Sequence, residues 1–167
     1  MCLTAAGCKK PRYDTSTPDL AIDAMARMVQ DGRPELLPTM VDIEARDITA
    51  KRRAGDVVWF DFRAICGGPR SQNDYLEIAT QYHTVLLSNV PHMPVSMASE
   101  ARRFTWLIDV LYDRRVKMIM SAAVPPEGLY TAGPMSHEFP RTVSRLHEMQ
   151  SSEFLALEHR TVDTHLT

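Results

Sequence analysis

The chain has 167 residues, enough for one domain with a sizeable hydrophobic core, and its 44% hydrophobic and 24% charged residues exclude a disordered chain. A net charge of -2 gives no overall field for nucleic acid or anionic membranes. No apolar stretch approaches the roughly 18 residues of a membrane-spanning helix. Three cysteines at irregular spacing fit neither a disulfide framework nor a zinc site, which favours a reducing compartment. The composition is that of a soluble, globular protein.

The N-terminal region predicts a flexible leader over 1–16 and then an amphipathic helix. Thr17 caps this helix, Pro18 suits its first turn, and the apolar residues that follow recur at helical spacing. Gly32 can end the helix in a left-handed conformation.

From residue 39 the hydrophobic period changes to two, which predicts a strand over 39–45 with one solvated face. A weaker strand is predicted over 48–50, and a turn over 52–56 with the basic residues of 51–53 at its tip. The branched and aromatic residues of 57–62 give the strongest strand signal in the chain. Together these segments predict a small antiparallel β meander.

A second group of elements follows Gly68. Ser71 and Asp74 have capping-box spacing and open a short helix that runs to about Tyr82. A buried strand is predicted over 83–87.

The next predicted helix is longer, with Ser96 or Ser99 as its cap, and it leads to a strand over 116–120. A strand, a helix and a strand form a βαβ unit, which implies parallel pairing. A last amphipathic helix is predicted over 139–149. One apolar stripe of the long helix comprises Ala101, Phe104, Ile108, Leu111 and Tyr112.

These elements predict a mixed α/β fold, with a small antiparallel meander, a βαβ unit with parallel strands, and flanking helices. The expected organisation is a helix plus meander over 17–62 and an α/β lobe over 63–157, together one compact unit. A flexible tail is expected over 158–167.

Several kinds of catalytic site are missing from the sequence. None of the seven glycines precedes a Lys-Ser or Lys-Thr pair, and Gly67-Gly68 is followed by Pro69, which has no N–H for a phosphate. The strand over 83–87 ends in Ser88-Asn89 rather than in carboxylates for magnesium. The histidines show no metal-ligand spacing. The sequence therefore predicts no catalytic residue and no metal ligand.

Cys66 has two possible interpretations. Two arginines lie close to it in sequence and could lower its pKa, but no partner base can be named. A buried, small hydrophobic residue is the preferred interpretation.

Arginines are the remaining candidates for ligand binding. Arg102 and Arg103 open the long helix, while Arg141 and Arg145 are four residues apart and therefore share a helix face. Such a pair can hold a phosphate or carboxylate bidentately. The alternative is a solvated face on which the latter two pair with acids of the same region, Glu138, Glu148 or Glu153.

Ordered strings across the chain resemble the Afg-one-like family of AAA+ P-loop ATPases, which includes the ZapE-type cell-division proteins. The similarity runs in consistent order from about Arg12 to Arg160. The strings are VWFDFRAICGGPRSQNDYL (58–76), HTVLL (83–87), EARRF (100–104), LID (107–109), LYD (111–113), RVK (115–117), SA (121–122), PP (125–126), LY (129–130), EFPRTVSRL (138–146) and EMQS (148–151).

The resemblance implies the C-terminal part of such an ATPase, which uses ATP and Mg²⁺ to remodel a protein partner at the bacterial division ring, in the cytoplasm. The family's phosphate loop and its magnesium-binding acids lie upstream of the matched part. The chain is therefore expected to be inactive alone and to need the N-terminal ATPase half or a neighbouring subunit. Arg102, Arg103, Arg141 and Arg145 become candidates for nucleotide sensing. The alternative is a stand-alone, non-enzymatic protein-binding module or a truncated gene product.

Overall fold

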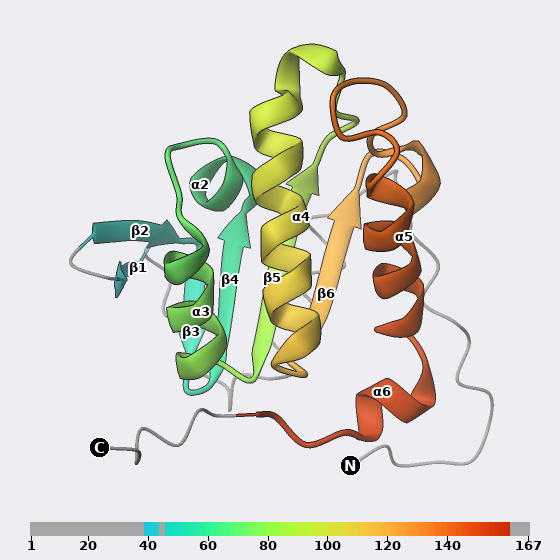
Figure 1. Cartoon of the computed structure of the whole chain (residues 1–167). Coiled ribbons are helices and arrows are strands. Elements are labelled where there is room, and N and C mark those ends of the chain that lie inside the picture. The colour runs from blue at the N-terminus through green and yellow to red at the C-terminus, as the bar shows by residue number, and fades with distance from the viewer. Residues whose placement is uncertain (1–38, 44–45, 161–167) are drawn as a thin grey trace, which may run out of the picture.

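The computed structural model describes residues 39–43 and 46–160 (Figure 1). The predicted leader, the predicted helix after Thr17 and the last seven residues lie outside this part of the chain. The elements in chain order are β1 (Thr39–Ile43), β2 (Arg46–Ala50), β3 (Arg52–Ala54), β4 (Val57–Asp61), α2 (Phe62–Cys66), α3 (Gln72–Gln81), β5 (Thr84–Val90), the 3-10 turn η1 (Val95–Met97), α4 (Ala98–Asp113), β6 (Lys117–Ala122), the 3-10 turn η2 (Pro126–Gly128), α5 (Phe139–Glu148) and α6 (Ser152–Ala156).

The strands form two sheets, which confirms the predicted mixed α/β fold. β1 and β2 make an antiparallel pair, and a four-stranded sheet has the order β3-β4-β5-β6. In that sheet β3 is antiparallel to β4, whereas β4, β5 and β6 are mutually parallel. The predicted meander is thus divided between two sheets, and β4 belongs to both the antiparallel and the parallel part. The reason is burial on both faces, because Val58, Trp59 and Phe60 are all buried, as in a central parallel strand.

Two local features differ from the sequence prediction. The turn predicted over 52–56 is shorter, because Arg52–Ala54 already forms strand β3, and the chain reverses at Gly55, whose φ of +52° suits glycine. The strand predicted to reach Phe62 ends at Asp61. The Asp61 carboxylate accepts a hydrogen bond from the Arg63 backbone N–H at 3.0 Å and so caps helix α2.

The helix starts were predicted with mixed success. The capping box of α3 is confirmed, because the Ser71 N–H donates to Asp74 at 2.6 Å and the Asp74 N–H donates to the Ser71 hydroxyl at 3.4 Å. The prediction that Ser96 or Ser99 caps α4 is wrong. Met97 occupies the cap position without a side-chain bond, and its N–H donates to the Pro94 carbonyl at 2.8 Å within the preceding 3-10 turn.

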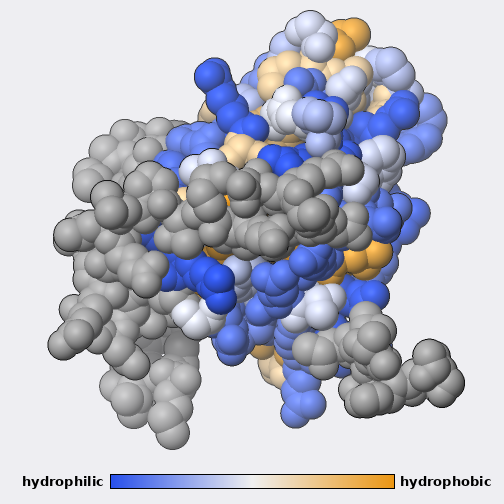
Figure 2. Space-filling view, turned by 90° about the vertical axis from the view of Figure 1, so that its left-hand side faces the viewer, coloured by the Kyte–Doolittle hydropathy of each residue, from blue (hydrophilic) through white to orange (hydrophobic). Residues whose placement is uncertain are grey.

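Helices α3, α4 and α5 lie on one face of the four-stranded sheet (Figure 1). Between them and the sheet lies a core in which the Phe104 ring centroid is 6.2 Å from Phe62 and 6.3 Å from Phe139. On the side shown in Figure 2 the described surface is mostly hydrophilic. Within the described residues, no helix has the length and apolar character required to cross a bilayer.

Helix α2 and the start of α4 both follow carboxyl ends of the parallel strands, at the top of the view in Figure 1. Ligands of open α/β sheets bind outside this edge of the sheet. A ligand site is therefore expected at this edge of the sheet.

Candidate functional site

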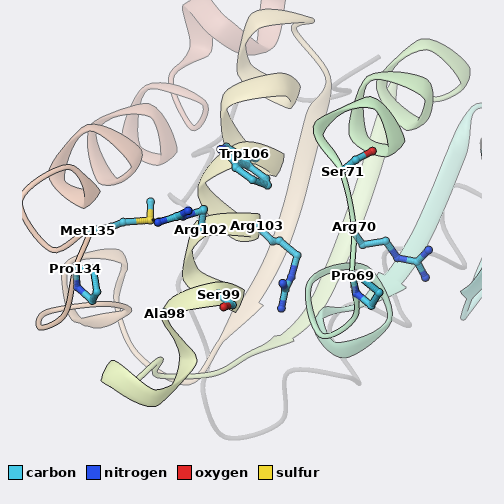
Figure 3. Close-up of a pocket in the computed structure, with 10 residues that line it drawn as sticks. All are labelled: Pro69, Arg70, Ser71, Ala98, Ser99, Arg102, Arg103, Trp106, Pro134 and Met135. Atoms are coloured by element: carbon cyan, nitrogen blue, oxygen red, sulfur yellow. The ribbon is translucent and has the colours of Figure 1, made fainter.

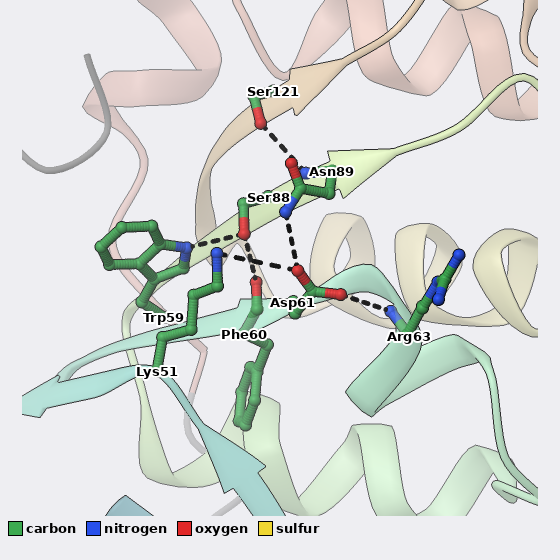
Figure 4. Close-up of polar contacts among 8 residues, drawn as sticks. All are labelled: Lys51, Trp59, Phe60, Asp61, Arg63, Ser88, Asn89 and Ser121. Atoms are coloured by element: carbon green, nitrogen blue, oxygen red, sulfur yellow. Dashed lines mark hydrogen bonds and ion pairs between the residues drawn. The ribbon is translucent and has the colours of Figure 1, made fainter. Parts of the chain in front are cut away.

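A polar network joins the carboxyl ends of β4, β5 and β6 (Figure 4). The Asn89 side-chain amide donates to the Asp61 carboxylate at 2.8 Å, and the Asn89 backbone N–H donates to the Ser121 hydroxyl at 3.1 Å. Lys51, which precedes β3, lies 3.7 Å from the same carboxylate. Asn89 has a φ of +62°, a conformation that asparagine tolerates better than most residues. These contacts tie three strand ends together.

Ser88 forms the buried part of this network. It accepts a hydrogen bond from the Trp59 indole N–H at 3.1 Å, and its own hydroxyl donates to the Phe60 carbonyl at 3.4 Å. Because Ser88 is fully buried, both bonds offset its loss of hydration. The role that follows from these contacts is structural.

The same edge does not fit a magnesium ion. The Asp61 carboxylate already accepts bonds from Asn89 and Arg63 and lies beside the Lys51 ammonium, so little of its lone-pair capacity remains. Within 39–43 and 46–160, no three histidine, cysteine or acidic side chains are grouped so that they could hold a metal ion. We therefore derive no catalytic step at these strand ends.

A second feature is a pocket of about 540 Å³ beside the first half of α4 (Figure 3). Its walls come from the loop after α2, from α4, and from the loop before α5. Ten residues line it, and three of them are arginines while none is acidic. The lining residues that matter most are Arg102, Arg103, Trp106, Pro69, Pro134 and Met135.

Two of the predicted arginines, Arg102 and Arg103, line this pocket. Arg103 donates from Nε to the Cys66 carbonyl at 2.6 Å, and its terminal nitrogen lies 3.5 Å from the Glu100 carboxylate. Arg102 is exposed, and its Nε contacts the Met135 sulfur at 3.4 Å. A sulfur is a weak acceptor, so the Arg102 guanidinium keeps strong donors for another partner.

Arg70 lines the rim of the pocket but turns its guanidinium away from Arg103 (Figure 3). One terminal nitrogen donates to the Ala64 carbonyl at 3.4 Å, while the buried Nε finds no hydrogen-bond acceptor among the described residues. Arg70 therefore adds positive charge to this region without pointing into the centre of the pocket.

Cys66 is buried behind the same loop, as the preferred interpretation of the sequence had it. Burial raises the pKa of its thiol to about 12, against a smaller opposing effect of a hydrogen bond with Tyr75. A thiol with so high a pKa is not a nucleophile near neutral pH. The nearby arginines do not activate it.

Arg145 lies elsewhere, between α5 and the second half of α4. It forms a hydrogen-bonded ion pair with Asp109 and lies 3.6 Å from Asp113, and its guanidinium stands 4.8 Å from the Tyr112 ring centroid. Its side chain is 13% exposed. Its acidic partners are thus on α4, rather than the glutamates considered from the sequence. Arg141 shares its helix but is exposed, with no side-chain bond to the described residues.

Sequence reasoning identified the four arginines but not the pocket. Three segments that are far apart in the chain form the pocket, so no local sequence motif predicts it. A signal did exist for the partners of Arg145, because Asp109 and Asp113 have the same four-residue spacing as Arg141 and Arg145.

The chain is similar to known proteins over most of its length. A family model described as AFG1-like ATPase matches residues 4–158. Cell division protein ZapE of Escherichia coli K12 is 38% identical over 138 residues, which cover 83% of this chain and 36% of ZapE, and ZapE of strain O157:H7 gives the same values. Lactation elevated protein 1 homolog B of Danio rerio is 30% identical over 177 residues, covering 85% of this chain and 35% of that protein. No solved structure matches the chain. The chain thus spans about a third of the length of these relatives.

Proposed function

The chain belongs to the AFG1-like ATPase family, and on that ground we propose that it is the C-terminal part of a ZapE-like ATPase that remodels a protein partner in bacterial cell division. The observation that carries the proposal is the match of one family model to residues 4–158. ATP and Mg²⁺ would be its cofactors, a division-ring protein its partner and the cytoplasm its location.

The proposal divides the work between two parts of the ATPase. The sequence has no phosphate loop, and Asp61, the carboxylate at the end of β4, is held by Asn89 and Arg63. Relatives contain about twice as much chain again beyond the matched third. We assign the phosphate loop and the magnesium-binding acids to that other part, in the same polypeptide or in a neighbouring subunit. The role of the present chain is then to complete the nucleotide site and to contact the partner.

Among the four candidates for nucleotide sensing, Arg141 has the best-placed guanidinium. It is exposed on the first turn of α5 and makes no side-chain bond to the described residues. Arg103 and Arg145 are held by protein acceptors, and Arg102 faces the pocket beside α4. An arginine from an adjacent subunit or lobe can stabilise charge that develops on a transferring phosphoryl group.

ATP turnover tests this assignment. The chain is expressed joined to the ATPase part of its relatives, and phosphate release is measured with and without the Arg141→Ala substitution. We expect turnover in the parent and a loss of about 100-fold or more in the variant, the scale of one lost donor to the charge of the transition state. The control is Arg160→Ala, which removes an exposed side chain and should leave turnover unchanged. The Arg160 backbone N–H bonds the Arg114 carbonyl at the C-terminal end of α4, away from the start of that helix.

Two results would contradict the proposal at different points. A joined protein that releases no phosphate argues against the ATPase role, whereas equal turnover in parent and Arg141→Ala removes only Arg141 from the site. The competing function is a stand-alone binding module without enzymatic activity, favoured by the missing phosphate loop. A ligand that binds only the native state raises the melting temperature, so a clear rise with millimolar Mg-ATP contradicts that module.

A further inference from the structure

We propose that the pocket formed by Arg102, Arg103 and Trp106 is a docking site for an acidic and apolar peptide segment of a partner protein. This goes beyond the proposed ATPase function and does not depend on it. The pocket volume of about 540 Å³ lies within the range of about 300–1,000 Å³ typical of pockets that enclose a ligand.

Charge complementarity is the first argument. No acid is among the ten lining residues, and the nearest acid contact of an arginine there is the loose 3.5 Å approach of Glu100 to Arg103. Arg102 has spare donors, because its contact is to a methionine sulfur. A guanidinium presents a planar fork that matches the two oxygens of a carboxylate. The pocket therefore selects an anionic group.

The rest of the lining selects an apolar neighbour for that group. Trp106, Met135, Pro69 and Pro134 supply an indole, a thioether and two proline rings to the same walls (Figure 3). Tryptophan, methionine and arginine are enriched in protein interfaces, and tryptophan and arginine dominate their binding energy. A carboxylate next to a leucine or phenylalanine side chain fits such a mixed surface.

A nucleotide phosphate chain fits less well. Its several oxygens need many donors at once, usually a run of backbone N–H groups and a lysine. Here Arg103 is committed to the Cys66 carbonyl, Arg70 is turned toward Ala64, and Pro69 has no N–H. The lining contains no lysine. The donors that remain suit one or two carboxylates.

Fluorescence anisotropy of labelled peptides tests the proposal without nucleotide, so its outcome is independent of ATP turnover. The probe is an octapeptide of alternating glutamate and leucine or phenylalanine. One comparison peptide replaces each glutamate with glutamine, and another replaces each apolar residue with serine. We expect saturable binding of the probe and much weaker binding of both comparison peptides.

Protein variants then locate the binding site. Arg102→Gln should weaken probe binding about ten-fold or more, because glutamine cannot make the charge-assisted hydrogen bonds that a guanidinium makes to a carboxylate. Arg102 is exposed and contacts only a methionine sulfur among the described residues, so this variant is expected to keep the parent melting temperature. Arg160→Gln, an exposed arginine outside the pocket, should bind like the parent. Arg102→Glu should favour a peptide in which lysine replaces each glutamate.

Several outcomes would overturn the proposal. These are no saturable binding at millimolar probe, equal binding of the glutamine peptide, or equal weakening by the Arg102→Gln and Arg160→Gln variants. Displacement of the probe by tripolyphosphate from the parent, but not from Arg102→Gln, would assign the pocket to phosphate and also overturn it.

Discussion

The two halves of helix α4 have opposite net charges, and their charged side chains have different partners. In the second half, Asp109 and Asp113 hold Arg145 of α5 against the Tyr112 ring. In the first half, Arg102 and Arg103 line a pocket without acidic lining residues. The first arrangement satisfies its charges within the fold and joins two helices. The second leaves N–H donors of the Arg102 guanidinium without a strong acceptor in the described part of the chain, so they can bind a ligand.

Helix stability alone does not explain this distribution. Asp113 is the last residue of α4, where a negative charge meets the negative end of the helix dipole and costs about 0.3–1 kcal/mol. Its approach to Arg145 offsets that cost. Charges at unfavourable helix positions therefore point to tertiary contacts or to ligands. In the second half of α4 the tertiary partner is an oppositely charged side chain. In the first half, Arg103 bonds the Cys66 carbonyl and, within the described residues, Arg102 contacts only the Met135 sulfur.

The largest expected loss of stability comes from removing the ion pairs of Arg145 with the second half of α4. Arg145→Ala removes an ion pair and a contact with the Tyr112 ring, and leaves Asp109 half-buried without its cation. Breaking a buried pair costs about 3–5 kcal/mol, and partial exposure of Asp109 and Asp113 reduces the expectation to about 2–3 kcal/mol. Urea unfolding measures the change. Arg141→Ala on the same helix is the control, with a change of about 0.5 kcal/mol or less. Similar losses in both variants would show that the Arg145 contacts contribute little.

A smaller effect is expected from Arg103→Met. Methionine retains much of the apolar stem but loses the 2.6 Å bond to the Cys66 carbonyl and the approach to Glu100. The loss of one charge-assisted hydrogen bond at a partly buried position predicts a destabilisation of about 1–2 kcal/mol. Thermal unfolding measures it, together with probe binding. An unchanged melting temperature would mean that the whole Arg103 guanidinium is available to a ligand.

The sequence predicted local features well where the cause is local. The capping box of Ser71 and Asp74 is confirmed, because both bonds lie within one helix turn. The α4 cap was missed because a 3-10 turn over Val95–Met97 replaces the expected serine. The division of the predicted meander was missed because pairing partners are set by the whole sheet. Strand β4 pairs with a segment after α3, which no local pattern reveals.

The candidate site was likewise predictable only in its local features. Spacing alone placed Arg141 and Arg145 on one helix face, but the direction in which each side chain points depends on the helix packed against it. Arg145 turns toward the acids of α4, and Arg141 remains exposed. The pocket beside Arg102 needs three distant segments to meet. Such a site emerges only when the fold is known.

The smallest expected effect is the sharpest test of the contrast within α4. Arg102→Ala should change the free energy of unfolding by about 0.5 kcal/mol or less, because this exposed side chain has only a sulfur contact to lose. Arginine and alanine are both good helix formers, so helix propensity adds little. Parallel urea titrations of Arg102→Ala and Arg145→Ala compare the two halves directly. A loss at Arg102 as large as that at Arg145 would mean that both halves serve the fold, and the open donors would then have a structural use.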